Sequence, residues 1–377
     1  MLIEIHMLKN YPSTNLNRDD AGAPKSCIFG GVQRARISSQ CLKRSWRVSP
    51  LFQKEMAGNL GIRTRKMPKL VAAQLEKMGV AAEYLPVVVK KLTGFANKNG
   101  KETDSGITNQ IVIYSAEDIQ AIADIIKAQI DAGKSVKDLE KINATEIEKM
   151  VKNAETRPIS LDIALFGRMV TSTAFADVEA SMQVAHAFST NRVIMETDFF
   201  TAMDDMIDGS VELGSGMMGD VDYNSSCYYI YASLDTNKLL ENLKHSENPE
   251  IMVKAAVPAL LRTMAFSNPS GKQNTFAGNV LPSAMLVECK EYPIPVSYAN
   301  AFVEPAKPKQ HDDLVQVSIE KLQKQVLETM QDFPSLKDAK RVWFSAGKKL
   351  PFPEDILIQN AANFDDLVQA VSTVITK

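Results

Sequence analysis

Residues 29–47 read FGGVQRARISSQCLKRSWR, a stretch with five Lys or Arg side chains and no acid. The whole chain has a formal net charge of -2, so this positive charge is a local feature. From Ala21 to Gln74 there are eleven basic side chains and one acid, Glu55, which gives +10 here and -12 for the remainder. A basic surface on an acidic body is typical of a protein that binds a polyanion with one face. On charge alone, a basic surface that only aids solubility remains an equal alternative.

The first half of the stretch predicts a short strand that presents arginines. Val32–Ile37 is β-compatible, and its period of two places Arg34 and Arg36 on the same side. Gly30 and Gly31 have no Cβ, so the backbone there could come close to a ligand. Two forked guanidinium groups on one face suit phosphate oxygens.

The second half predicts a helix with a cationic flank. Ser38 or Ser39 is a typical N-cap, and the free N–H groups and dipole of a helix N-terminus favour an anion. Leu42 and Trp46 predict a core edge on this helix. The polar side chains beside that edge are Gln40, Lys43, Arg44 and Arg47. Such a surface could follow a phosphodiester backbone rather than hold a single phosphate.

Composition excludes several classes of protein. At 377 residues, 45% hydrophobic and 23% charged, the chain is typical of a soluble globular protein of one to three domains. It has no run of 18 apolar residues and no signal-like start, so we expect a cytoplasmic protein without a membrane partner. The four cysteines are scattered without a CxxC pair, and the four histidines have no ligand spacing to them. We therefore expect reduced thiols, no metal and no cofactor.

The order of predicted elements indicates an α+β fold, a sheet domain with large insertions. Residues 2–8 predict a first strand, followed by a polar loop over 15–31. Residues 69–155 predict mostly helices, including a capping-box start at Ser115–Asp118. Further strands are expected at 178–188, 225–234 and 283–289, and short or long helices at 157–170, 236–245 and 249–266. The remainder predicts mainly helices.

Three other motifs are weak. Residues 214–219 match GxGxxG but lead into acids and a strand, which does not fit a dinucleotide site. Residues 204–209 resemble a calcium loop in the wrong register. His186 lies in an apolar run, where a hydrogen-bonded core histidine is the more common case. Asp19 and Asp20 could bind a metal or act as a base, but forming a turn is the favoured interpretation.

Several blocks, in order along the chain, resemble the CasC family, the backbone (Cas-seven family) subunits of the type I-E CRISPR Cascade complex. The matching blocks are NLNRDD at 15–20, IFGG at 28–31, RISSQCLKR at 36–44, DIALFGRM at 162–169, QVAHA at 183–187, DFFTA at 198–202 and GKQNTFA at 271–277. Together they span most of residues 1–300. No block that we recognise lies in the last 70 residues.

The resemblance implies a hand-shaped protein: a modified RRM-like (ferredoxin-like) palm, a helical fingers insertion and a β-hairpin thumb. The expected divisions are palm at 1–59, with the basic segment, helical fingers at 60–155, palm at 156–189, thumb hairpin at 190–224, and palm, RNA-contacting loop and C-terminal helices at 225–377. Met195–Asp222 contains eight acids and no base. We therefore expect the thumb to face the basic surface of the next copy in a head-to-tail stack.

The resemblance also implies a function, that of a non-catalytic scaffold polymerised along a CRISPR RNA. The guide would then pair with target DNA, and other Cascade subunits would complete the complex. The family's RNA contacts correspond to Arg18, Lys25, Ser38, Gln40, Lys43, Arg47, Arg168, Met169 and Lys272; the residues themselves add Arg34, Arg36 and Arg44.

Two alternatives remain. One is a metal-dependent ribonuclease like the type III backbone subunits, with Asp19 or Asp20 as the catalytic residue. The other is a general single-strand binder, for which the basic segment has few aromatic residues.

Overall fold

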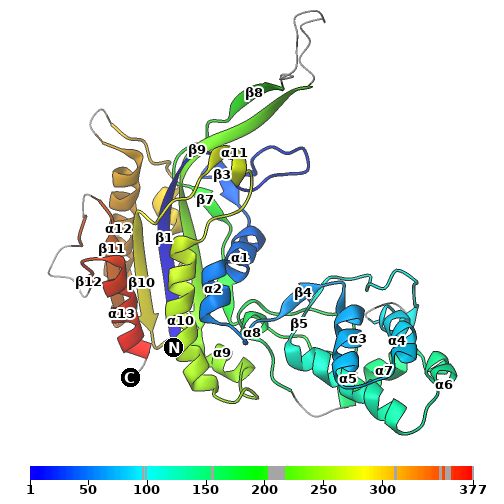
Figure 1. Cartoon of the computed structure of the whole chain (residues 1–377). Helices are drawn as coiled ribbons and strands as arrows, with labels where there is room; N and C mark the ends of the chain where they lie inside the picture. Colours follow the sequence, from blue (N-terminus) through cyan, green and yellow to red (C-terminus); the bar gives the residue numbers. More distant parts are fainter. Residues whose placement is uncertain are drawn as a thin grey trace, which may run out of the picture. The chain divides into compact units, whose positions relative to one another are not determined.

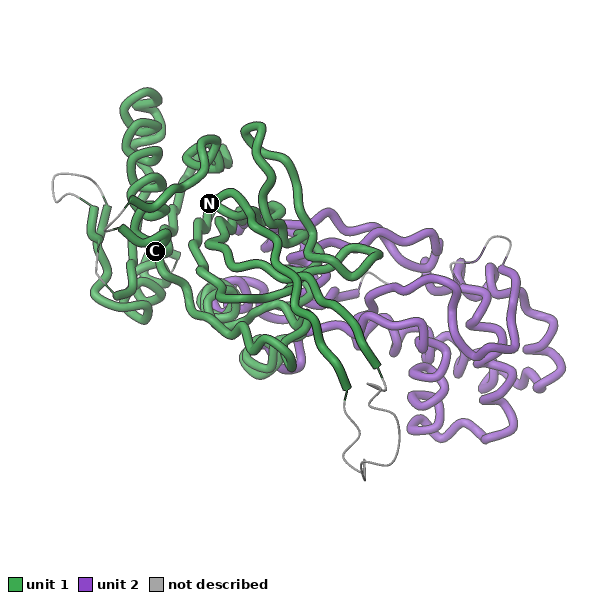
Figure 2. The backbone as a smooth tube through the Cα atoms, turned by 90° about the horizontal axis from the view of Figure 1, so that it is seen from above, with its two compact units in different colours: residues 1–55, 184–233, 256–377 green, residues 56–183, 234–255 purple. Residues whose placement is uncertain are grey.

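The computed structural model describes residues 1–95, 97, 100–153, 157–202, 217–309, 312–347, 350–352 and 358–375. The chain divides into two compact units, each assembled from distant segments (Figure 2). The first contains residues 1–55, 184–233 and 256–377, and the second contains residues 56–183 and 234–255. Within the described residues, no helix has the length and apolar character that crossing a membrane requires.

A large sheet forms the framework of the first unit, and the α+β class is confirmed. The strand order is β12-β11-β10-β1-β9-β7-β3-β2, and β6 and β8 also pair with β9 (Figure 1). The strands are β1 (Leu2–Thr14), β2 (Ser26–Phe29), β3 (Val32–Ile37), β6 (Met182–Val184), β7 (Ala187–Ser189), β8 (Glu196–Ala202), β9 (Met217–Asp235), β10 (Ala284–Lys290), β11 (Lys340–Ser345) and β12 (Ile358–Asn360). The predicted strands near 2–8, 32–37, 178–188, 225–234 and 283–289 are confirmed.

Strand β1 is buried on both faces because both faces of the sheet are covered where it runs. Residues 2–9 are all buried, which a sheet covered on only one side would not produce. Leu8 packs with Leu286 and Trp343 against Leu322 and Val326 of α12 (Leu314–Asp332). The other helices that include residues of this unit are α1 (Ser39–Arg47), α2 (Pro50–Glu55), α10 (Pro249–Phe266), α11 (Gln273–Phe276), η3 (Ala299–Phe302), η4 (Pro334–Leu336) and α13 (Phe364–Ile375).

Charged side chains form a row on a buried face of this sheet. Glu4 of β1 lies opposite Glu288 of β10, and Glu288 lies opposite Arg341 of β11. Arg341 and Lys290 form ion pairs with Glu288, and Lys290 also pairs with Glu4. His6 Nε2 lies 3.3 Å from the Glu288 carboxylate. Opposite charges therefore accompany the two facing carboxylates, which would otherwise repel each other.

The hairpin β2–β3 corrects the prediction of a loop over 15–31. Residues 26–29, expected in a loop, form β2 and pair antiparallel with β3, with Phe29 opposite Val32. Gly30 and Gly31 form the two-residue turn, with φ of 59° and 73°, a conformation that favours glycine. A Cβ on Gly30 would lie 2.1 Å from the carbonyl oxygen of Val303. Gly30 therefore allows a tight turn against another backbone segment of the protein, whereas a Cβ on Gly31 would meet nothing within 4 Å.

The predicted helical C-terminus is only partly correct. Strand β11 (KRVWFS) extends the sheet beyond β10, and β12 pairs parallel to it. The aromatic and β-branched residues of β11 are typical of strands. The predicted helices at 236–245 and 249–266 are confirmed as α9 (Thr236–Asn242) and α10.

The second unit is mainly helical. Ser115 and Asp118 form the predicted capping box of α5. The elements are β4 (Ile62–Thr64), α3 (Met67–Lys77), η1 (Ala82–Tyr84), α4 (Leu85–Leu92), β5 (Val112–Tyr114), α5 (Ala116–Asp131), α6 (Val136–Lys141), α7 (Ala144–Asn153), α8 (Leu161–Phe166) and α9. Its core includes Leu75, Phe95, Tyr114, Ile122 and Val151. The predicted division into palm, fingers and thumb stays a prediction.

Candidate nucleic-acid interface

Helix α1 begins where β3 ends, and a side chain from another segment fixes this junction. Ser38 is the N-cap, and its Oγ accepts a hydrogen bond from the N–H of Cys41 at 3.3 Å. The N–H of Ser38 donates to Oδ1 of Asn17 at 2.9 Å. Because Ser38 is buried and both groups are engaged, its first role is to position the helix.

The side chains of helix α1 form a buried set on one face and a polar set nearer the surface on the adjacent flank. Ser39, Leu42 and Trp46 are buried in the core, as the apolar edge predicts. Gln40 is exposed, and Lys43 and Arg47 are half-buried on the adjacent flank, one turn apart. Desolvation lowers the pKa of Lys43, which is the expected effect when a stem packs on protein and the ammonium stays near the surface.

The segment 15–25 is held to β3 by a backbone bond and to the start of α1 by the Asn17 side chain. The N–H of Lys25 donates to the carbonyl of Asn17, and the N–H of Arg36 donates to the carbonyl of Lys25. Inside the segment, Oδ1 of Asp19 accepts the N–H groups of Ala21 and Ala23 at 2.9 and 3.0 Å. Asp19 therefore forms a turn, the interpretation that the sequence favoured. This turn places exposed Arg18 and half-buried Lys25 on the segment attached to α1.

The segment 267–278 approaches the same loop closely at Leu16. A Cβ on Gly271 would lie 2.3 Å from the carbonyl oxygen of Leu16, so only glycine allows this approach. The next residue, Lys272, has φ of 49°, an uncommon left-handed conformation for a lysine. Gln273 holds the segment through Nε2, which donates to the carbonyls of Pro269 and Gly278. Lys272 is thereby brought beside the segment that presents Arg18.

Electrostatics confirm a positive environment around these segments. The pKa of His186 is lowered by desolvation and by the nearby charges of Arg36 and Lys25. Desolvation raises the pKa of the Cys41 thiol, and the charges of Lys25 and Arg44 oppose that rise. Cations from the loop, β3 and α1 therefore share one field, which favours an anionic ligand.

The family is decided by a match over nearly the whole chain. The family model described as "CT1975-like protein" matches residues 3–370. The chain belongs to the CT1975-like protein family. Among curated proteins, no match was found.

Solved structures similar to this CT1975-like protein come from CRISPR assemblies. One is described as "CRISPR RNA-guided surveillance complex, pre-nicking"; it has a TM-score of 0.83, 27% identity, and full coverage of both chains. A second is described as "CRISPR RNA-guided surveillance complex"; it has a TM-score of 0.71 and 22% identity, covering 99% of this chain and 100% of that chain. The second likeness concerns the fold alone.

Arg34 and Arg36 share one side of β3 but have different surroundings. The Arg34 side chain is buried, and its Nη1 and Nη2 donate to the carbonyls of Ser189, Thr190, Phe302 and Val303 at 2.7–3.2 Å. This guanidinium joins three segments of the CT1975-like protein. Arg36 is half-buried and bonds to Ser26 O and to Nδ1 of His186 at 2.9 Å. His186 is exposed, so its predicted core position is wrong.

Arg168 and Met169 belong to the second unit. Arg168 is buried and pairs with Asp118 at 2.5 Å, and its guanidinium lies 5.3 Å from the ring centre of Phe175. Met169, in contrast, is 91% exposed. The next residue is held by a bond from the N–H of Val170 to Asp177. Arg168 therefore anchors the segment, and Met169 is the side chain that it presents.

The hairpin of β8 and β9 carries acids and exposed apolar side chains. Residues 196–202 pair with 217–223 and are all exposed. Phe199, Phe200, Met217 and Met218 are exposed, and Asn15 Nδ2 donates to the carbonyl of Asp222 at the hairpin base. The weak motifs at 204–209 and 214–219 lie, wholly or in part, outside the described residues.

Residues that sequence reasoning missed hold these segments together. They are Asn15 and Asn17 in the loop, and Lys9, Tyr11 and Asn268 near the segment 267–278. The NLN pattern was a usable signal, because asparagine often bonds to backbone in loops.

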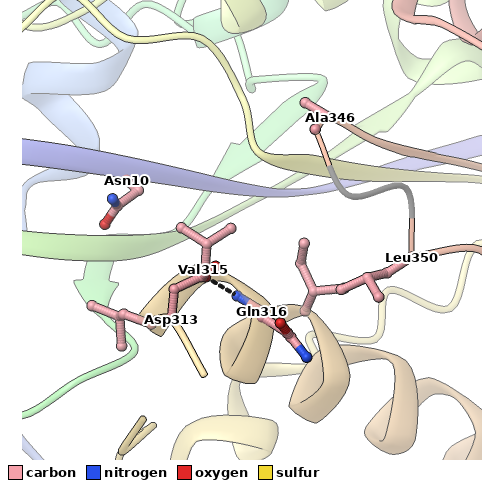
Figure 3. A pocket seen from close by; sticks show the side chains of 9 residues that line it. Asn10, Asp313, Val315, Gln316, Ala346 and Leu350 are labelled. Atoms are coloured by element: carbon pink, nitrogen blue, oxygen red, sulfur yellow. Dashed lines mark hydrogen bonds between the residues drawn. The ribbon is translucent and has the colours of Figure 1, made fainter. Parts of the chain in front are cut away.

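A separate cavity of about 340 Å³ lies beside α12, lined by Asn10, Asp313, Gln316 and Leu350 among others (Figure 3), and contains no predicted site residue. Within the described residues, no group of three His, Cys, Asp or Glu is placed to hold a metal.

Proposed function

We propose that this chain is the guide-RNA-binding backbone subunit of a CRISPR RNA-guided surveillance complex of the type I-E Cascade class. One observation supports this above the others. Three segments distant in sequence, 15–25, 36–47 and 267–278, are joined by specific bonds and close backbone contacts, and each carries cations. The likeness at TM-score 0.83 to a chain of a CRISPR RNA-guided surveillance complex supplies the context.

The proposed RNA contacts are the predicted residues whose side chains reach the surface. They are Arg18, Lys25, Arg36, Gln40, Lys43, Arg44, Arg47 and Lys272, all exposed or half-buried. Arg34, Ser38 and Arg168 instead position the segments that carry them, since their polar groups bond within the protein. Met169 would contact bases, because a flexible thioether adapts to irregular apolar surfaces.

In this proposal the protein grips the RNA backbone, and base pairing supplies specificity. Phosphate contacts position a strand without reading its sequence, so the guide would remain able to pair with target DNA. An RRM-like palm, head-to-tail copies and the other Cascade subunits belong to the same proposal. We also propose that the subunit is not an enzyme. The turn role of Asp19 supports this, because Oδ1, one of its two carboxylate oxygens, already accepts two backbone N–H groups.

Native purification followed by sequencing of co-purifying RNA tests the proposal. Uniform short RNAs that share repeat-derived ends would support it. Heterogeneous RNA, or none, would contradict it. Incubation of the assembly with complementary RNA and Mg²⁺ tests the scaffold role separately, since cleavage that disappears in Asp20→Ala would identify a nuclease.

A further inference from the structure

A pocket of about 470 Å³ lies in the first unit beside the cationic flank of α1. Helices α1 and α2 form one wall, and residues 266–279 form the other. Cys41, Arg44 and Ser45 line it from α1, away from the core face, and Arg44 borders the face of Gln40, Lys43 and Arg47. None of the RNA contacts implied by the family resemblance lines this pocket.

The amide of Asn268 is fixed in one orientation at the pocket wall. Its Oδ1 accepts the hydroxyl of Tyr11 at 2.7 Å and the Nζ of Lys9 at 3.3 Å. Lys9 and Tyr11 are buried, and Lys9 also donates to the carbonyl of Ser267 at 2.9 Å. Burial lowers the pKa of Lys9 to about 7, and both of its protonation states retain N–H donors. With its oxygen occupied, Asn268 can offer the pocket only the two donors of Nδ2.

The other walls add an aromatic ring, a cation and an acceptor. Phe266 at the end of α10 is 46% exposed, and its ring packs edge-on against Phe364 with centroids 5.3 Å apart. Arg44 is exposed and makes no ion pair within the described residues. The hydroxyl of Ser45 donates to the carbonyl of Cys41 at 2.8 Å, so its oxygen remains an acceptor.

We propose that this pocket binds one nucleotide of the strand that α1 grips, with its base in the pocket and its phosphate on Arg44. Phe266 would stack on the base, because every nucleobase has a π-face that an aromatic ring can contact. Nδ2 of Asn268 donates to a carbonyl of the base, and Arg44 contacts the phosphate as a forked donor. The link to a gripped strand rests on the proposed function, whereas nucleotide binding in the pocket can be measured on its own.

The chain contains its own probe for this site. Cys41 lines the pocket and is partly accessible, Cys27 is partly accessible on β2, and the other two cysteines are buried. We would measure the alkylation rate of each thiol by mass spectrometry in RNA-free protein, with UMP or ribose 5-phosphate added. The two ligands carry the same phosphate, but only UMP carries a base. UMP should slow alkylation of Cys41 at least several-fold at saturation, and ribose 5-phosphate should not, while Cys27 reacts at an unchanged rate.

Two outcomes in the unaltered protein would overturn the proposal. One is that UMP leaves the Cys41 rate unchanged. The other is that ribose 5-phosphate or inorganic phosphate protects as well as UMP, which means that Arg44 binds an anion and the pocket holds no base.

Variants separate this site from the RNA grip. Asn268→Asp keeps the acceptor for Lys9 and Tyr11 but removes the Nδ2 donors, so UMP protection should be lost without loss of fold. Phe266→Ala should lose it as well. Lys43→Ala with Arg47→Ala should keep UMP protection while weakening long RNA. If UMP still protects Cys41 in both Asn268→Asp and Phe266→Ala, the proposed contacts are wrong. If the protein does not bind long RNA but UMP still protects Cys41, the proposed function fails and the nucleotide pocket stands.

Discussion

The side-chain oxygen of Asn17 accepts a hydrogen bond from the backbone N–H of Ser38, 2.9 Å away. This bond joins the loop that carries Arg18 and Lys25 to the first turn of the helix that carries Lys43 and Arg47. The loop and the helix are thereby held as one cationic surface. The proposed function depends on this arrangement. A flexible loop would lose conformational entropy on binding a strand, and this loss would weaken binding.

Asn17→Ala should therefore weaken RNA binding more than it weakens the fold. Loss of one hydrogen bond costs about 1 kcal/mol of stability, whereas release of the loop should reduce RNA affinity roughly tenfold, about 1.4 kcal/mol. Filter binding and urea unfolding would measure the two effects. Asn143→Ala is a matched control, since Oδ1 of Asn143 accepts a backbone N–H of Thr145 in the second unit. Equal RNA affinities for the two variants would contradict the role of Asn17.

Arg34→Ala should lower the free energy of unfolding of the first unit. It should leave RNA affinity unchanged, because Arg34 is not needed at the RNA surface. The substitution leaves buried carbonyls without a donor, at about 1–3 kcal/mol for each unsatisfied group. Both tryptophans, Trp46 and Trp343, are buried in the first unit, so their fluorescence in urea measures its unfolding. Arg36→Ala should show the opposite pattern, with nearly unchanged stability and weaker RNA binding. A stable Arg34→Ala variant with reduced RNA affinity would reverse our assignment of the two residues.

The pair Arg34 and Arg36 also shows which features could be predicted from the sequence and which could not. The period of two correctly placed both arginines on one side of β3, and the serine cap and apolar edge correctly predicted α1. The strand pattern does not show which groups lie against that side of β3. The carbonyls that accept from Arg34 belong to residues 150 or more positions away in the sequence. The same limit explains Gly30, whose close neighbour is Val303, and the missed pocket, whose walls come from residues 41–51 and 266–279.

Strand β11 shows a different cause of error. Its sequence KRVWFS is typical of a strand, but the surrounding proline-rich and helical segments drew the prediction toward helix. Pairing with β10 decides the outcome, because a backbone edge next to Cys289 and Glu288 offers ladder bonds that no helix there would satisfy.

The buried charge row predicts a pH dependence of stability. Burial would raise the pKa of Glu288, but His6, Lys290 and Arg341 outweigh it and lower the pKa to about 2. A glutamate in an unfolded chain has a pKa of about 4.3. The stabilisation is therefore complete above about pH 4.3 and is lost as the pH falls toward 2. The difference in unfolding free energy between wild type and Glu288→Gln should shrink in that range by a few kcal/mol.

Exposed Glu320 on α12 provides the comparison for this measurement. The Glu320→Gln variant should follow the wild-type curve from pH 6 to pH 2.5. If Glu288→Gln also parallels the wild type over that range, the pKa of Glu288 is not lowered in the folded protein and the charge row is wrongly described.

The acidic hairpin should contribute to assembly between copies. Glu196, Asp198 and Asp220 are exposed on β8 and β9, and the basic stretch lies elsewhere in the chain, so head-to-tail copies could pair them. Replacing all three by Gln or Asn should shorten assemblies on RNA at low salt, as seen by mass photometry. Assemblies of unchanged length at low salt would exclude this contact. Exposed charge pairs are salt-sensitive, so the effect should fade at high salt.

The central claim is that one flank of α1 grips an RNA backbone, and the salt dependence of RNA affinity tests it most directly. Lys43→Ala with Arg47→Ala should weaken binding of two unrelated RNAs alike and reduce the slope of log K against log salt by about 1.4, since each single-strand phosphate contact contributes about 0.7. Lys321→Ala with Lys324→Ala removes the same charge from α12 and should leave the slope unchanged. An unchanged slope in the α1 variant, or a loss confined to one RNA sequence, would contradict the account.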